Sequence, residues 1–231
     1  MLLFKIAGIQ KTTILDYPTK VAAIVFTQGC NFRCGYCHNP DLLEQNKNTD
    51  FLPENFISFL KTRQGKLDGV VITGGEPTLQ SGLYDFIKQI KQLDFAVKLD
   101  TNGTNPKILK KLLSENLVDY IAMDIKAPIE KYSEITGINV NTNNIKTSID
   151  LIIKSLTEYE FRTTVLKSQL SFEDFDKIGQ TIKGANLYYL QKFVPNKIYN
   201  EKLNSDTTYN NDELQTICNH MKQYIKEVTY R

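Results

Sequence analysis

Apolar, β-rich runs recur along the chain at intervals that suit alternating strands and helices. Six of them predict strands, at residues 21–27, 69–74, 95–101, 119–125, 161–166 and 187–193. Between most of these runs, apolar residues recur every three or four positions, as on the buried face of a helix. Strands that alternate with helices pair in parallel through right-handed crossovers. The pattern therefore predicts an α/β fold, either an incomplete (β/α)6 barrel or an open doubly wound sheet.

Two of the predicted helices begin with recognisable capping residues. Asn105 and Pro106 suit the cap and the first helical position of one helix. Ser171 is placed to cap another, which continues through Phe175 and Ile178. Three further apolar faces predict helices at 83–93, at 145–156 and at the C-terminal end, about 210–228.

The length and composition suit one domain. A chain of 231 residues with 41% hydrophobic residues can bury one sizeable core. We therefore expect a single domain over 1–231, with a core at about 15–195 followed by the C-terminal helix, and a surface loop at 44–50. The 28 basic and 26 acidic residues nearly balance, which argues against a nucleic-acid partner. No run approaches the roughly 20 apolar residues of a membrane span, so no membrane partner is expected.

The cysteines are concentrated in one short stretch. Cys30, Cys34 and Cys37 have the spacing C-x3-C-x2-C, and Cys218 lies far away. No long apolar run with a cleavage site opens the sequence, so we expect a cytoplasmic protein, in which clustered cysteines bind metal more often than they form disulfides. Structural zinc takes four protein ligands, whereas three thiolates can hold a four-iron four-sulfur cluster and leave one iron open.

Unusual residues follow the ends of four successive predicted strands. The cysteines follow the first strand, and residues 74–77, Gly-Gly-Glu-Pro, follow the second. Residues 100–103, Asp-Thr-Asn-Gly, end the third, and Asp124 and Lys126 close the fourth. The carboxyl ends of parallel strands share one rim, so these segments should converge on one site.

These motifs together resemble the radical S-adenosylmethionine superfamily. The resemblance rests on the C-x3-C-x2-C loop, with Tyr36 before the third cysteine, and on the Gly-Gly-Glu-Pro segment. LDYPTK (15–20), FTQGCNFRCGYCHNP (26–40) and FRTTV (161–165) are similar to the glycyl-radical-activating enzymes. Within that group the sequence looks most like activating proteins of anaerobic ribonucleoside-triphosphate reductase, with pyruvate formate-lyase activating enzyme as a near relative. The resemblance covers about residues 10–195 and favours the barrel over the open sheet.

The resemblance implies a radical S-adenosylmethionine oxidoreductase. Cys30, Cys34 and Cys37 would hold a 4Fe–4S cluster, and the amino and carboxylate groups of S-adenosylmethionine would chelate its open iron. An electron from flavodoxin or ferredoxin would then release methionine and a 5′-deoxyadenosyl radical. That radical would take a hydrogen atom from a backbone glycine of class III ribonucleotide reductase.

The resemblance also assigns residues to S-adenosylmethionine. Gly74 and Gly75 let the backbone approach the ligand, and the carboxylate of Glu76 and nearby carbonyls would accept hydrogen bonds from the methionine ammonium. Gln191 stands where relatives use a histidine for the ribose. Asp100 and Asp124 match positions that surround a monovalent cation in relatives. Lys126 and Arg162 match positions that neutralise the methionine carboxylate or contact the nucleoside. The other residues expected at the site are Tyr36, Pro77, Thr101 and Asn102.

Other interpretations remain open on the sequence. The partner is alternatively pyruvate formate-lyase or another glycyl radical enzyme, or the substrate is small, as in 7-carboxy-7-deazaguanine synthase. A non-catalytic zinc-binding scaffold is the alternative outside enzymes. Three residues are expected to stay outside cluster ligation: Cys218 as a buried hydrophobe, His220 as a solvated side chain, and His38 in a packing or supporting role.

Overall fold

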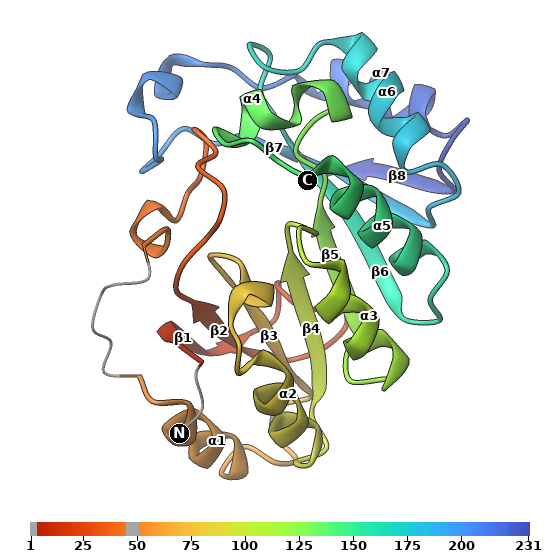
Figure 1. Cartoon of the computed structure of the whole chain (residues 1–231). Coiled ribbons are helices and arrows are strands. Elements are labelled where there is room, and N and C mark those ends of the chain that lie inside the picture. Colours follow the sequence, from red (N-terminus) through yellow and green to blue (C-terminus); the bar gives the residue numbers. More distant parts are fainter. Residues whose placement is uncertain (1–3, 45–50) are drawn as a thin grey trace.

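The computed structural model describes residues 4–44 and 51–231, and its strands form one sheet (Figure 1). The strands follow one another across the sheet in chain order, with β1 and β8 at the two edges. β1 is antiparallel to β2, and each later pair is parallel. The strands are β1 (Ile6–Thr13), β2 (Ala22–Thr27), β3 (Gly69–Gly74), β4 (Ala96–Thr101), β5 (Tyr120–Asp124), β6 (Glu158–Val165), β7 (Leu187–Lys192) and β8 (Glu227–Tyr230).

Helices connect the parallel strands, and Figure 1 shows α2, α3 and α5 along one side of them. The helices are α1 (Pro53–Lys61), α2 (Leu83–Lys91), α3 (Pro106–Ser114), α4 (Tyr132–Thr136), α5 (Thr142–Ile153), α6 (Phe172–Thr181) and α7 (Asn211–Met221). Within the described ranges, no helix combines the length and the apolar character that crossing a membrane requires.

The two faces of the sheet have different environments because side chains alternate along a strand. On β4, Val97 and Leu99 belong to the large core between the sheet and the helices. Lys98 and Asp100 alternate with them and therefore point to the other, concave face. A smaller apolar cluster lies on that face, and it includes Ile24, Val71 and Ala122. The concave face is thus apolar in part and carries charged groups toward the carboxyl ends of the strands.

The predicted architecture is confirmed. All six predicted strands form, as β2 to β7, and the α/β sheet ends at two free edges as an incomplete barrel does. The predicted caps are present as well. The side chain of Asn105 accepts a hydrogen bond from the backbone of Ile108, and Ser171 and Asp174 form a reciprocal capping box at the start of α6.

The prediction was wrong at both edges of the sheet. The C-terminal helix ends at Met221, not near 228, and Glu227–Tyr230 forms β8. Val228 continues the helical spacing of apolar residues, but the backbone around it pairs with β7. β1 was missed because an edge strand is half exposed and its apolar pattern is interrupted.

Two further predictions concern the end of a helix and a surface loop. Leu156, counted on the apolar face of α5, lies beyond the end of that helix and is fully exposed. Residues 45–50 of the predicted surface loop lie outside the described residues.

Candidate functional site

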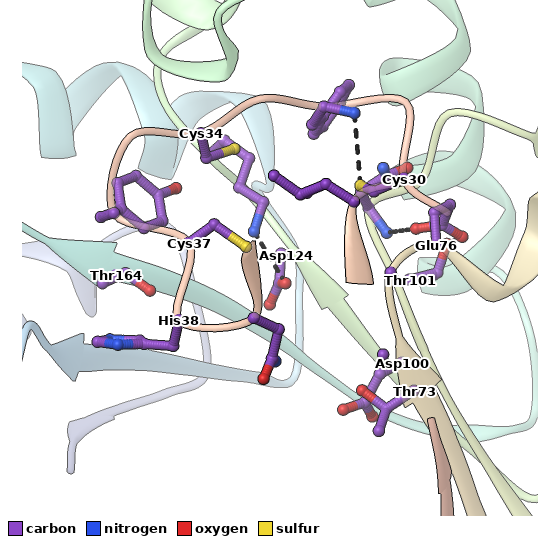
Figure 2. A pocket seen from close by; sticks show the side chains of 18 of the residues that line it. Cys30, Cys34, Cys37, His38, Thr73, Glu76, Asp100, Thr101, Asp124 and Thr164 are labelled. Atoms are coloured by element: carbon purple, nitrogen blue, oxygen red, sulfur yellow. Dashed lines mark hydrogen bonds and ion pairs between the residues drawn. The ribbon is translucent and has the colours of Figure 1, made fainter. Parts of the chain in front are cut away.

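The cysteine loop, residues 28–40, leaves the carboxyl end of β2 and borders a cavity of about 280 Å³. Cys30, Cys34 and Cys37 all line this cavity (Figure 2). Backbone groups from a distant segment hold the loop: the amide of Asn200 donates to the carbonyl of Gly35 at 2.8 Å, and Tyr199 donates to Cys37 at 3.0 Å. The segment that follows β7 therefore anchors the cysteine loop.

Burial determines the protonation of two of the thiols. Burial raises the pKa of Cys30 to about 12 and also raises the pKa of Cys34. A metal centre binds the thiolate form, so its positive charge must displace these protons when it binds. The thiols of Cys30 and Cys34 therefore stay neutral in the metal-free protein at neutral pH.

The arrangement of the thiols fits an iron–sulfur cluster. Among the described residues, no three His, Cys, Asp or Glu side chains come together to hold a single metal ion. The three cysteines instead surround a shared space, with thiol groups on separate parts of its wall (Figure 2). Three thiolates that line one cavity can hold an iron–sulfur cluster, in which each ligand binds a different iron. The donor set and the cavity thus fit the expected cluster.

Gly75 brings the loop after β3 against the cysteine loop. Its amide donates to the carbonyl of Thr27 at 2.9 Å, and the amide of Glu76 donates to Gly29 at 2.8 Å. A Cβ on Gly75 would overlap the carbonyl of Gly29. Gly74 has φ of 111°, a conformation that favours glycine, and a Cβ there would overlap the backbone of Thr27. Both glycines are thus required for the close approach of two loops.

The carboxylate of Glu76 lines the cavity and accepts hydrogen bonds from two neighbouring loops, and its contact with a methionine ammonium stays a prediction. Its Oε1 accepts from the Thr78 amide at 3.0 Å and from the hydroxyls of Thr78 and Thr101 at 2.5 and 2.7 Å. Its Oε2 accepts from the Asn102 amide at 2.6 Å. Burial raises the pKa of Glu76, and these donors oppose that shift. Glu76 therefore joins the loops that follow β3 and β4.

Alternating charges cross the concave face beside the cysteines. Arg162 donates from Nε to Asp124 at 2.8 Å and from Nη1 to Asp100 at 3.2 Å. The other Asp124 oxygen accepts from Nζ of Lys126 at 3.0 Å. Burial raises the pKa of Asp124, but the two cations outweigh it and hold the pKa at about 2. Arg162 lies between the two carboxylates and contacts both of them, and a monovalent cation beside them stays a prediction.

A second row of buried charges supports the first, and sequence reasoning missed it. Glu160 is fully buried on β6, two residues from Arg162, and accepts from Arg231 at 2.7 Å and from the Tyr120 hydroxyl at 2.9 Å. Lys98 lies 3.6 Å from Asp100. Both residues alternate with apolar neighbours on strands that were predicted correctly. Glu160 is two residues from Arg162, and Lys98 is two residues from Asp100. Residues two apart on a strand point to the same face, so this spacing could have identified both.

The predicted site residues come together almost completely. Each of them except Pro77 lines the cavity, whereas Pro77 is buried in the turn beside it. The structure adds lining residues that were not predicted as site residues: Phe32, His38, Asn39, Leu43, Thr73 and Thr164. Thr164 lies two residues after Arg162 on β6, so the same alternation indicates its position.

The two histidines and the remaining cysteine have distinct environments. The His38 ring stacks on Phe193 with centroids 5.9 Å apart, consistent with a packing role. Cys218 is buried on the apolar face of α7, as predicted. His220 is not simply solvated, because its Nε2 lies 2.9 Å from Oδ1 of Asp176 on α6.

Comparison with known proteins places this geometry in a family. The model of the radical SAM superfamily matches residues 24–181. A protein of Methanocaldococcus jannaschii named as a glycyl-radical enzyme activating enzyme is 35% identical over 98% of this chain and 95% of its own length. A pyruvate formate-lyase-activating enzyme of Clostridium pasteurianum is 31% identical, over 59% of each chain.

A solved structure shows the same fold. Streptococcus suis SuiB, bound to its precursor peptide SuiA, superposes with a TM-score of 0.71 at 14% identity, over 90% of this chain and 48% of SuiB. The chain thus spans about half of SuiB, and this likeness concerns the fold alone. Sequence similarity over nearly the full length, together with the cysteine-lined cavity, shows that the chain belongs to the radical S-adenosylmethionine superfamily, among the glycyl-radical enzyme activating enzymes.

Proposed function

We propose that this protein cleaves S-adenosylmethionine reductively and installs a glycyl radical on the large subunit of class III ribonucleotide reductase. The observation that carries the proposal is the meeting of three cysteines and two cations, Lys126 and Arg162, in one cavity. The similarity to a protein named as a glycyl-radical enzyme activating enzyme supports the type of target.

In this proposal Cys30, Cys34 and Cys37 hold a 4Fe–4S cluster. When bound, the reduced cluster supplies the electron that divides S-adenosylmethionine into methionine and a 5′-deoxyadenosyl radical. Flavodoxin or ferredoxin provides that electron. The free thiols and the oxygen-sensitive chemistry require reducing conditions, and we therefore place the reaction in the cytoplasm.

The chain itself binds and orients S-adenosylmethionine. Lys126 and Arg162 carry positive charge to the cavity wall and would neutralise the methionine carboxylate. Asp124 contacts both cations and keeps them at fixed positions. The Glu76 carboxylate already accepts from Thr78, Thr101 and Asn102, so we assign nearby backbone carbonyls a share of the hydrogen bonds from the methionine ammonium.

The nucleoside would lie toward the β6 and β7 side of the cavity. Thr164 and Gln191 line this side with groups that form neutral hydrogen bonds. Gln191 carries both a donor and an acceptor, as recognition of ribose hydroxyls requires. We assign the ribose contact to Gln191.

The test is made under strict anoxia with reconstituted protein, dithionite, S-adenosylmethionine and candidate glycyl radical enzymes from the same genome. The proposal predicts 5′-deoxyadenosine and a glycyl doublet in the electron paramagnetic resonance spectrum of the ribonucleotide reductase. A doublet only on a pyruvate formate-lyase would instead support the second candidate, which the similarity to the Clostridium pasteurianum enzyme favours. An intact cluster without 5′-deoxyadenosine would contradict both.

A further inference from the structure

Three neutral side chains form a closed ring of hydrogen bonds beside Cys30. Nδ2 of Asn102 donates to Oδ1 of Asn31 at 2.8 Å, and Nδ2 of Asn31 donates to Oγ1 of Thr104 at 3.0 Å. Oγ1 of Thr104 donates to Oδ1 of Asn102 at 2.7 Å and closes the ring. Each member is donor and acceptor in the same direction, so each bond polarises the next.

The part of the ring on the loop after β4 is fixed from behind. The amide of Asn102 donates to Oε2 of Glu76 at 2.6 Å. From α5, Nδ2 of Asn144 donates to the carbonyl of Thr104 at 3.0 Å, and the Ser148 hydroxyl donates to the carbonyl of Gly103 at 2.7 Å. The loop carrying Asn102 and Thr104 is thus held by two other elements, and the ring extends this support to Asn31.

Holding Asn31 also orients a hydrogen bond to sulfur. The next peptide group in the chain places the amide of Phe32 3.4 Å from Sγ of Cys30, as its donor. An N–H group that donates to a ligand sulfur stabilises the added negative charge of a reduced iron–sulfur cluster and so raises its reduction potential. The ring therefore holds the residue that immediately precedes the N–H donor to Cys30, and this donor affects the reduction potential of the cluster.

We propose that Asn31, with Asn102 and Thr104, is a positioning group that fixes Cys30 and its N–H···S hydrogen bond for cluster binding. The inference rests on the proposed function, because it requires Cys30 to be a cluster ligand. The ring connects the cysteine loop to the loop after β4, which the carboxylate of Glu76 also contacts. Since the ring is neutral, it supplies this link without adding charge to the cavity.

The test compares Asn31→Ala and Thr104→Val with Thr104→Ser in the full-length chain. Thr104→Val keeps the side-chain shape but removes the hydroxyl, whereas Thr104→Ser keeps the hydroxyl and should close the ring. Melting of each cluster-free variant reports on folding. Iron and sulfide content, the rate of cluster loss to an iron chelator, and a redox titration followed by electron paramagnetic resonance report on the cluster.

The proposal predicts that Asn31→Ala and Thr104→Val lose the cluster about fivefold faster than wild type, the effect of one net hydrogen bond. Their reduction potentials should shift to more negative values, and Thr104→Ser should match wild type in both respects. Wild-type potential and cluster retention in Thr104→Val would overturn the inference, as would an altered Thr104→Val alongside an unaltered Asn31→Ala. A wild-type protein that holds no iron or sulfide would instead refute the proposed function, so the two failures are distinguishable.

Discussion

Asp124 and Arg162 are directly paired residues on the adjacent parallel strands β5 and β6, and Nε of Arg162 donates to Oδ1 of Asp124 at 2.8 Å. The register of two strands thereby fixes a guanidinium at the cavity wall. Lys126 occupies the other oxygen of the same carboxylate. One acidic side chain thus orients both of the cations that we assign to S-adenosylmethionine.

Replacing Asp124 by Asn should weaken binding of S-adenosylmethionine. The amide cannot satisfy both cations, and loss of one partner of a hydrogen-bonded charge pair costs about 2 kcal/mol at a partly exposed site. We expect KM for S-adenosylmethionine to rise roughly 30-fold, with a smaller change in kcat. Steady-state formation of 5′-deoxyadenosine measures both constants. The exposed Asp150→Asn variant is the control, and equal KM values in the two variants would contradict this role.

Replacing Cys34 by Ala should abolish reductive cleavage of S-adenosylmethionine while the protein stays folded. The thiol is one of three that surround the cavity, whereas Cys218 is buried on the apolar face of α7. Cys218→Ala should therefore keep its iron and sulfide and lose about 1 kcal/mol of stability at most. Metal analysis and 5′-deoxyadenosine assays separate the variants. Wild-type turnover in Cys34→Ala would disprove the ligand assignment.

Replacing Gly75 by Ala should separate the two loops that meet at the cavity. The new Cβ would overlap the backbone carbonyl of Gly29, which cannot move as a flexible side chain would. We expect a loss of about 3 kcal/mol in the free energy of unfolding and loss of cluster binding. Gly8→Ala is the matched control, since its Cβ would meet only the Phe26 side chain at 3.7 Å. Urea unfolding of both variants measures the difference, and equal stabilities would contradict the prediction.

Asp174 should make a pH-dependent contribution to stability. Burial raises its pKa, but the ammonium of Lys131 at 2.6 Å and the hydrogen bonds from Ser171 outweigh burial and lower the pKa below 3.8. A lowered folded-state pKa gives a stabilisation that is complete above the unfolded value of 3.8 and is lost as the pH falls through the folded value. Asp174→Ala should therefore cost about 1 kcal/mol at pH 7 and progressively less in acid.

Unfolding by urea between pH 7 and pH 3 measures this contribution. Glu173→Ala on the same first turn of α6 is the control, because its side chain is exposed and should show only the small effect of a charge near a helix end. A difference between wild type and Asp174→Ala that stays constant down to pH 3 would refute the linkage.

The central strands were predictable because buried parallel strands read as continuous apolar runs, as in residues 69–74. The site residues at the carboxyl ends of these strands were predictable as well, because the carboxyl ends of parallel strands lie along one edge of the sheet. The edge strands β1 and β8 were not, because one side of each lacks a partner and their sequences carry little apolar signal.

The partners of individual polar groups were also beyond the sequence. Nothing in the residues around Glu76 indicates that its carboxylate accepts from Thr101 and Asn102, which end the next strand and begin the loop after it. Equally, the spacing of α7 places His220 away from Cys218, but only the packing of α6 against α7 brings Asp176 within 2.9 Å of it. Such contacts depend on tertiary distances that periodicity does not contain.

The bonds from Tyr199 and Asn200 to the cysteine loop have a consequence for the order of synthesis. The ribosome makes the cysteines early, but the backbone groups that hold their loop follow only after β7, at about 5–20 residues per second. A nascent chain therefore exposes three thiols for several seconds before their binding loop is complete. Timing of iron–sulfur delivery, rather than affinity alone, would then decide whether a newly made chain matures or oxidises.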